Sequence, residues 1–222
     1  MILAVNAKVY YPYSFGARLL RLARAIDKVA KEYSITTIIA PPHTELKEVK
    51  DIVEVTKVYA QHLDPVEPGA HTGSVILEGI KEIIDGSIIN HSEKRMRLDE
   101  IELVVSKLRR AGKESLVCAP TPNTAAAVAA LRPSMIAMEP PELIGTGVSV
   151  SRARPETVVE TVRAVKGTGF AGPVLVGAGI SSGEDVRKAI ELGADGVLVA
   201  SAVVKADDPY VKLKEFAEAM VR

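Results

Sequence analysis

A carboxylate followed by two prolines and a glycine-rich stretch is the segment of this chain best suited to chemistry. Glu139 ends the short apolar run of residues 135–138, and residues 140 and 141 are both proline. The prolines fix φ and stiffen the exit from the run, whereas Gly145 and Gly147 let backbone N–H groups turn toward an anion. We interpret Glu139 as a catalytic base beneath a closing loop, where exclusion of water would raise its pKa toward neutrality.

Two groups that would assist a base follow other apolar runs. His91 comes after the run that ends at Asn90. If a helix begins there, its N-terminal N–H groups would disfavour imidazolium and leave a neutral ring that donates a hydrogen bond to a substrate carbonyl. Lys8 lies two residues past Asn6, where a cation would attract phosphate and stabilise an enediolate, and Asn6 would fix the lysine or contact a substrate hydroxyl. The alternatives are a hydrogen-bonded strand-end histidine without a catalytic role for His91 and a solvated lysine for Lys8.

Two turns late in the chain are suited to holding an anion. In residues 176–181, Gly179 lets the backbone approach a ligand closely. In residues 199–202, the N–H groups of Ala200 and Ser201 can point at phosphate oxygens. Hydrogen bonds to a charged group are worth about 1.5–3 kcal/mol each, so three or four would hold a small phosphate ester.

Alternating strand and helix patterns must position these residues. Nearly continuous apolar runs are typical of parallel strands covered on both faces, and they occupy residues 2–5, 36–40, 55–60, 87–90, 116–119, 135–138, 174–177 and 196–200. Helical periodicity occupies residues 16–33, 44–51, 74–84, 98–111, 123–131, 155–167, 182–192 and 208–221. Residues 181–184 resemble a helix capping box.

Eight such units without a compositional break predict a single (β/α)₈ barrel domain over residues 1–222. An open doubly wound sheet is the alternative. It usually has a glycine-rich turn after its first strand, whereas this chain continues with Asn6-Ala7-Lys8. In a barrel the working residues sit at the C-terminal ends of the strands, where all the candidates above fall.

Composition excludes several classes of protein. The 28 basic and 28 acidic residues give a formal net charge of zero, so nothing favours nucleic acid or an anionic membrane. No apolar run reaches the roughly 18 residues of a membrane span, and the N-terminus lacks the pattern of a secretion signal. A lone Cys118 suits a reducing cytoplasm, and the four histidines lack metal-ligand spacing, so we expect no metal site.

Three motifs together resemble the triosephosphate isomerase family: Asn6-x-Lys8, residues 90–93 (Asn-His-Ser-Glu), and residues 139–147. They occur in order on strands 1, 4 and 6, and the similarity runs nearly end to end. The resemblance implies interconversion of dihydroxyacetone phosphate and glyceraldehyde 3-phosphate, in glycolysis and gluconeogenesis, without cofactor or metal. It assigns Glu139 as the base, neutral His91 as the electrophile, and Lys8 and Asn6 to substrate binding.

The resemblance also implies how the phosphate and the neighbouring subunits are held. Ile144 and Gly145 of the closing loop would join Gly179, Ala200 and Ser201 around the phosphate. The chain is similar to the shorter, archaeal branch of the family, which favours a homotetramer over a dimer. The long loop of residues 61–73 would insert beside a neighbour's active site.

Two other functions are open to a phosphate-binding barrel. A transferase of the thiamine phosphate synthase kind shares the late glycine turns, but it would need an acidic cluster for a metal–diphosphate, and none falls at the predicted strand ends. A non-catalytic phosphate sensor would be expected to lose Glu139, His91 or Lys8, and all three are present.

Overall fold

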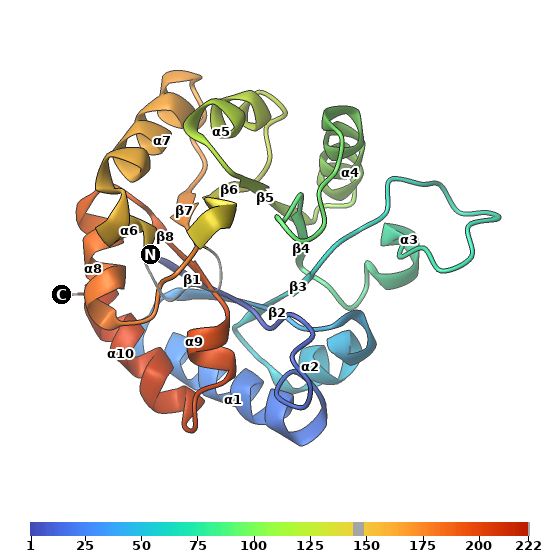
Figure 1. Cartoon of the computed structure of the whole chain (residues 1–222). Coiled ribbons are helices and arrows are strands. Elements are labelled where there is room, and N and C mark those ends of the chain that lie inside the picture. Colours follow the sequence, from blue (N-terminus) through green and yellow to red (C-terminus); the bar gives the residue numbers. More distant parts are fainter. Residues whose placement is uncertain (144–148, 222) are drawn as a thin grey trace.

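Eight parallel strands close into a ring, since β1 pairs with both β2 and β8. The computed structural model describes residues 1–143 and 149–221, and its helices surround the strands (Figure 1). The closed ring confirms the predicted (β/α)₈ barrel and excludes the open sheet. The strands are β1 (Ile2–Asn6), β2 (Thr36–Ala40), β3 (Lys57–Ala60), β4 (Gly86–Ile89), β5 (Glu114–Ala119), β6 (Met135–Met138), β7 (Val174–Val176) and β8 (Gly196–Val199).

Burial on both faces explains why the strands are apolar at nearly every position. Along β1, Leu3 and Val5 belong to the large cluster between strands and helices, whereas Ala4 belongs to a second cluster. That second cluster takes side chains from all eight strands and fills the barrel, with Tyr59 as a large, fully buried member. The alternation of the two clusters along each strand is the reason that no strand shows a polar face.

The helices agree with the predicted pattern except in four places. They are α1 (Gly16–Tyr33), η1 (His43–Glu45), α2 (Leu46–Ile52), α3 (Leu77–Ile80), α4 (Leu98–Arg110), α5 (Pro122–Ala129), η2 (Pro141–Leu143), α6 (Val150–Ala153), α7 (Pro155–Gly167), α8 (Gly183–Glu191), α9 (Ser201–Val204) and α10 (Pro209–Val221). The short helices η2, α6 and α9 were not predicted. The predicted helix at 74–84 is wrong apart from the single turn α3, because Val75 is paired in both directions with Asp64 instead.

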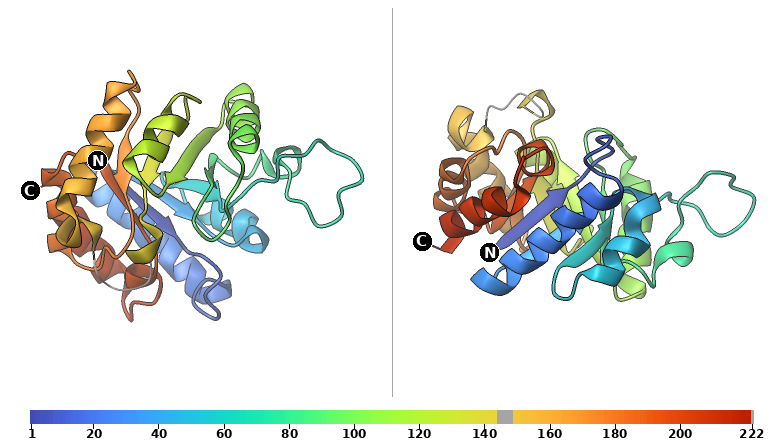
Figure 2. Two further views of the ribbon diagram at one scale, coloured as in Figure 1. Left: turned by 45° about the horizontal axis from the view of Figure 1, so that its top comes forward. Right: turned by 90° about the horizontal axis from the view of Figure 1, so that it is seen from below.

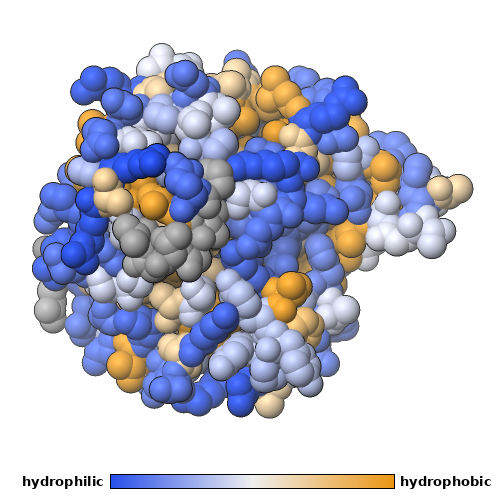
Figure 3. Space-filling view, viewed as in Figure 1, coloured by the Kyte–Doolittle hydropathy of each residue, from blue (hydrophilic) through white to orange (hydrophobic). Residues whose placement is uncertain are grey.

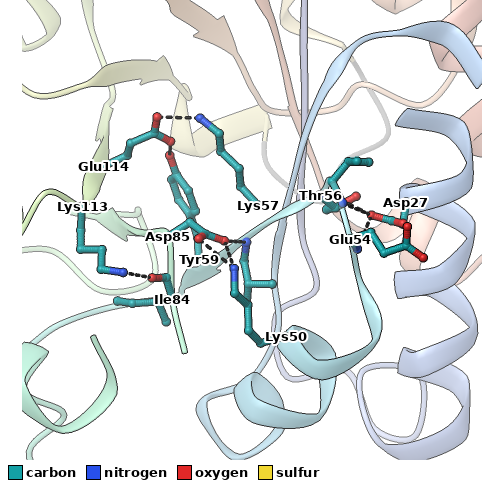
Figure 4. Close-up of polar contacts among 12 residues, drawn as sticks. Asp27, Lys50, Glu54, Thr56, Lys57, Tyr59, Ile84, Asp85, Lys113 and Glu114 are labelled. Carbon is teal, nitrogen blue, oxygen red and sulfur yellow. Dashed lines mark hydrogen bonds and ion pairs between the residues drawn. The ribbon is translucent and has the colours of Figure 1, made fainter. Parts of the chain in front are cut away.

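Polar side chains close the N-terminal end of the barrel. Lys57 at the start of β3 and Tyr59 both donate to Glu114 at the start of β5 (Figure 4). Asp85, which precedes β4, accepts from Lys50 and from the backbone of β3. These contacts tie β3 to β5, which flank β4 in the ring, and join Asp85 to α2 and β3, at the end of the barrel opposite the candidate site.

The connection from β3 to α3 is the most prominent departure from a rounded shape. Residues 61–76 project from the barrel in every view (Figures 1 and 2), and most of the face seen in Figure 3 is hydrophilic. This loop is held by Lys107 of α4, a buried lysine whose Nζ donates to Val66 O at 3.0 Å and contacts Glu78 at 3.1 Å.

Over the described residues, no helix combines the length and apolar character needed to cross a membrane.

Candidate active site

One cavity at the C-terminal ends of the strands gathers the predicted site residues. It has a volume of about 210 Å³. All seven predicted site residues that the structure describes line it: Asn6, Lys8, His91, Glu139, Gly179, Ala200 and Ser201. Ile144 and Gly145 lie outside the described residues. Sequence reasoning missed other lining residues, including Tyr10, Ile180 and Ser181, which carry no motif of their own.

Glu139 and His91 face one another in this cavity. Each side chain is buried, and His91 Nε2 lies 3.5 Å from Glu139 Oε2. Glu139 directly follows β6, and Gly177 directly follows the neighbouring β7. A Cβ at residue 177 would lie 2.5 Å from Glu139 Cγ and 2.7 Å from its Oε1. Gly177 is therefore the residue that leaves room for the carboxylate.

The backbone after β4 fixes the tautomer of His91. The N–H of Glu93 donates to His91 Nδ1 at 3.2 Å, so in the neutral ring the proton is on Nε2, the nitrogen that faces Glu139. The turn is held by Asn90, whose φ is 59° and whose side chain bonds to Cys118 O and to the N–H of Met96. The predicted donors at a helix N-terminus are thus supplied by a turn, since α4 begins only at Leu98.

Opposing effects set the pKa of Glu139. Burial raises the pKa of its carboxyl, while the nearby His91 ring, the Cys118 thiol and the Lys8 cation lower it, and the balance lies below the ordinary value. Among the described neighbours the polar groups therefore outweigh desolvation, and the rise in pKa expected beneath a closed loop stays a prediction, since residues 144–148 lie outside the described residues. Glu139 is ionised at neutral pH, as a base must be before it takes a proton. Its Oε2 is buried and accepts no hydrogen bond from a residue in the described parts of the chain.

Lys8 is held at the cavity by its own backbone and by a carboxylate. Its φ is 53°, and its N–H donates to Asn6 Oδ1 at 3.0 Å. Gln61, whose contribution no motif indicated, donates to Lys8 O at 3.0 Å. Lys8 Nζ lies 2.6 Å from Glu93 Oε1. Of the two roles considered for Asn6, the structure supports fixing the lysine.

The late turns form the opposite wall of the cavity. Ala178 and Gly179 both have left-handed φ, 71° and 72°, and Ala200 precedes the short helix α9 that begins at Ser201. Tyr10 from the β1–α1 loop also lines the wall, with Lys205 Nζ 4.1 Å from its ring centroid. At Ala178, Gly179, Ala200 and Ser201 the two turns present backbone and small side chains to a ligand, in keeping with an anion site.

Cys118 is the single cysteine of the chain, and its thiol is buried. Burial raises the pKa of the Cys118 thiol well above its usual range, with a further contribution from the charge of Glu139, so Cys118 is a packed interior residue. Within residues 1–143 and 149–221, no three His, Cys, Asp or Glu side chains gather as they would to hold a metal ion.

Comparison with known proteins agrees with this geometry. Residues 1–219 match the family model for triosephosphate isomerase. The triosephosphate isomerase of Caldivirga maquilingensis is 50% identical over 221 residues, which cover 99% of this chain and 97% of that protein. Those of Methanothermus fervidus and Methanocaldococcus jannaschii are each 49% identical, over 99% and 97% of this chain and 98% of each relative. The chain therefore belongs to the triosephosphate isomerase family and is an isomerase that acts on triose phosphates.

Proposed function

We propose that Glu139, His91 and Lys8 carry out the triosephosphate isomerase reaction, the interconversion of dihydroxyacetone phosphate and glyceraldehyde 3-phosphate. The observation that carries this proposal is the pairing of a buried carboxylate with a histidine Nε2 at 3.5 Å on one cavity wall. A base and a hydrogen-bond donor placed so close can act on adjacent carbons of one small substrate.

The proposed steps conserve atoms and charge. Glu139 takes a proton from C1 of dihydroxyacetone phosphate, and the C–H electron pair forms the C1–C2 double bond of an enediolate. His91 Nε2–H donates to the carbonyl oxygen at C2 as negative charge develops there, and it relays a proton between the two oxygens. Glu139 then returns a proton to C2, which gives the aldehyde. A neutral ring suits this role because the N–H of Glu93 occupies Nδ1.

Lys8 and Asn6 support the charge of the intermediate in this proposal. The Lys8 ammonium lies in the same cavity as the carboxylate and would stabilise the enediolate electrostatically. Asn6 acts on Lys8 through the hydrogen bond to its backbone N–H. Glu93 holds the ammonium at 2.6 Å and also provides the N–H that fixes His91, so one residue orients two catalytic groups.

We assign the phosphate to the wall formed by Gly179, Ala200 and Ser201, together with Ile144 and Gly145. Residues 178 and 179, in the turn after β7, have left-handed φ, which can direct their N–H groups toward a ligand. In the turn after β8, the helix α9 begins at Ser201. Backbone N–H groups at such turns bind anions without a cationic side chain. We expect the reaction to need neither a cofactor nor a metal ion.

A single substitution tests the base. Glu139→Asp retracts the carboxylate by about one methylene, so kcat should fall by roughly 10²- to 10³-fold while KM changes little. Steady-state assays of triose phosphate isomerisation, with and without a chelator, measure both values. Glu156→Asp on the exposed start of α7 is the matched control and should behave as wild type. Full turnover by Glu139→Asp would overturn the assignment, and a requirement for Mg²⁺ would favour the transferase.

We also propose that the chain works as a single-domain subunit of a cytoplasmic homo-oligomer, and that a tetramer is favoured over a dimer. The projecting loop of residues 61–76 and the exposed side chains of Val9 and Tyr11 beside the cavity support one interface. Exposed Leu98 and Leu103 on α4 support a second. Light scattering after size-exclusion chromatography should give four times the 23.7 kDa of one chain. A monomer mass would contradict the proposal.

A further inference from the structure

The β7–α8 turn of the cavity wall has a backbone that needs support. Ala178 and Gly179 are consecutive residues with left-handed φ, and Ser181 in the same turn lines the cavity. A residue with a Cβ in this region costs roughly 1–2 kcal/mol, and such conformations persist only where their surroundings impose them. The surroundings of residues 178–182 therefore decide the shape of this wall.

Asp185 holds the second half of this turn, directly after the left-handed residues. It is 1% exposed, and its Oδ2 accepts from the N–H groups of Ser181 and Ser182, both at 3.0 Å. The two serine hydroxyls donate to the same oxygen at 3.1 and 3.0 Å. The capping box of α8 thus consists of Ser182 and Asp185, one residue later than the box expected at 181–184.

Asp185 also joins this turn to the segment that follows residue 148. Ser151 Oγ donates to the Asp185 carbonyl at 3.0 Å and lies 2.6 Å from Ser149 Oγ. At the other end of the turn, the N–H of Val150 donates to Ala178 O at 3.3 Å. The buried Asp185 Oδ1 accepts no hydrogen bond from a described residue, and Arg152 Nη1 lies 3.8 Å from it. The backbone carbonyl of Asp185, and its carboxylate through Arg152, thus connect the turn to the segment of residues 149–152.

We propose that Asp185 is a positioning residue for phosphate recognition: its carboxylate holds residues 178–182 in the shape that fits the phosphate of the substrate. Asp185 does not contact the substrate itself. Its Oδ2 already accepts four hydrogen bonds from the turn, and its negative charge would repel the negative charge of the phosphate. A carboxylate is required because four donors converge on one oxygen, and charge-assisted hydrogen bonds are about twice as strong as neutral ones. The inference rests on the proposed phosphate site.

The test separates phosphate binding from chemistry. In Asp185→Ala the KM for glyceraldehyde 3-phosphate and the inhibition constant of inorganic phosphate should each rise about 10-fold, while kcat stays within about 3-fold. Turnover of unphosphorylated D-glyceraldehyde should not change. Asp185→Asn keeps one acceptor oxygen and should recover part of both losses. If Asp185→Ala does not fold, Asp185→Asn decides alone, with an expected rise of about 3-fold in both constants.

Two further variants make the result specific. Asp27→Ala is a matched control, because Asp27 is also a buried aspartate that accepts several backbone N–H groups, but near the start of β3 (Figure 4). Asp27→Ala should have a lower free energy of unfolding, with the KM for glyceraldehyde 3-phosphate and the inhibition constant of phosphate unchanged. Ser201→Asp places a negative charge in the proposed phosphate site itself and should raise both constants. If both constants rise in Ser201→Asp but stay unchanged in the Asp185 variants, this inference is overturned. It is also overturned if Asp27→Ala raises both constants as much as Asp185→Ala does. Unchanged constants in Ser201→Asp as well would overturn the phosphate site and this inference with it.

Discussion

At the scale of single residues, the position of Glu139 depends on a glycine in the next strand unit. Gly177 belongs to a glycine turn that the sequence associates with phosphate, yet its Cα lies against the side chain of Glu139. The carboxylate is kept ionised by His91, Cys118 and Lys8 in spite of its burial. The base is therefore defined by neighbours from four different strands and loops, which hold it in one place and one protonation state.

Gly177→Ala tests this dependence. The added Cβ would lie 2.5 Å from Glu139 Cγ, so the carboxylate must shift, and a displacement of about 1 Å costs roughly 10²-fold in kcat. Gly177 has no left-handed φ, so its backbone conformation is one that alanine also adopts, and the nearest atoms that the added Cβ would meet belong to the side chain of Glu139. Steady-state kinetics and circular dichroism should show a folded protein with reduced kcat.

Gly167→Ala in α7, where a Cβ would meet nothing within 4 Å, is the control for Gly177→Ala. It should keep the wild-type kcat. If Gly177→Ala also kept the wild-type kcat, the close packing against Glu139 would have no role in placing the base.

At the scale of elements, Asp27 of α1 anchors the start of β3. Its Oδ1 accepts from the N–H groups of Glu54, Val55 and Thr56, and its Oδ2 lies 3.0 Å from Lys31 Nζ. Burial raises the pKa of the Asp27 carboxyl, but the three backbone donors and Lys31 outweigh it and lower the pKa to about 2. Because the pKa is lower in the folded protein than in the unfolded chain, the ionised group stabilises the fold.

The stabilisation by Asp27 should depend on pH in a defined window. It is fully present above the unfolded pKa of 3.8 and is lost as pH falls through the folded pKa of about 2. Asp27→Asn should lower the free energy of unfolding by about 2 kcal/mol at pH 6 and by about half as much at pH 3. Denaturant unfolding at one protein concentration measures both values.

Asp99→Asn, at an exposed aspartate of α4, is the control for the pH dependence. Its free energy of unfolding should follow that of the wild type at both pH values. A loss in Asp27→Asn that is the same at pH 6 and pH 3 would show that the charge of Asp27 contributes nothing.

At the scale of the whole molecule, the barrel and most of the site could be predicted because both follow from local patterns. Apolar runs locate the strands, and a barrel brings the residues after the strands to one mouth, so Glu139, His91 and Lys8 met as expected. Contacts between residues far apart in the chain gave no such signal. The space that Gly177 leaves for Glu139 and the bond from Gln61 to Lys8 are of this kind.

Local patterns also failed where a particular side-chain hydrogen bond sets the backbone conformation. The helical periodicity of residues 74–84 yields only α3, because the N–H of Val75 donates to Asp64 Oδ2 and the carbonyl of Val75 accepts from the Asp64 N–H. The donor to His91 is the N–H of Glu93 in a turn, whereas the sequence suggested a helix N-terminus. In both places a hydrogen bond sets the chain conformation, and the spacing of residue types in the sequence does not predict that bond.

The exchange of the substrate's carbon-bound proton tests the central claim most directly. NMR of dihydroxyacetone phosphate in D₂O should show that the wild-type protein places deuterium at C2 of the aldehyde, and at C1 of dihydroxyacetone phosphate re-formed from the enediolate, since the proton on Glu139 exchanges with solvent. Glu139→Gln, which keeps the shape and removes the base, should lose both isomerisation and exchange while still binding the substrate. Deuterium incorporation at the wild-type rate by Glu139→Gln would contradict the account, because another group would then be the base.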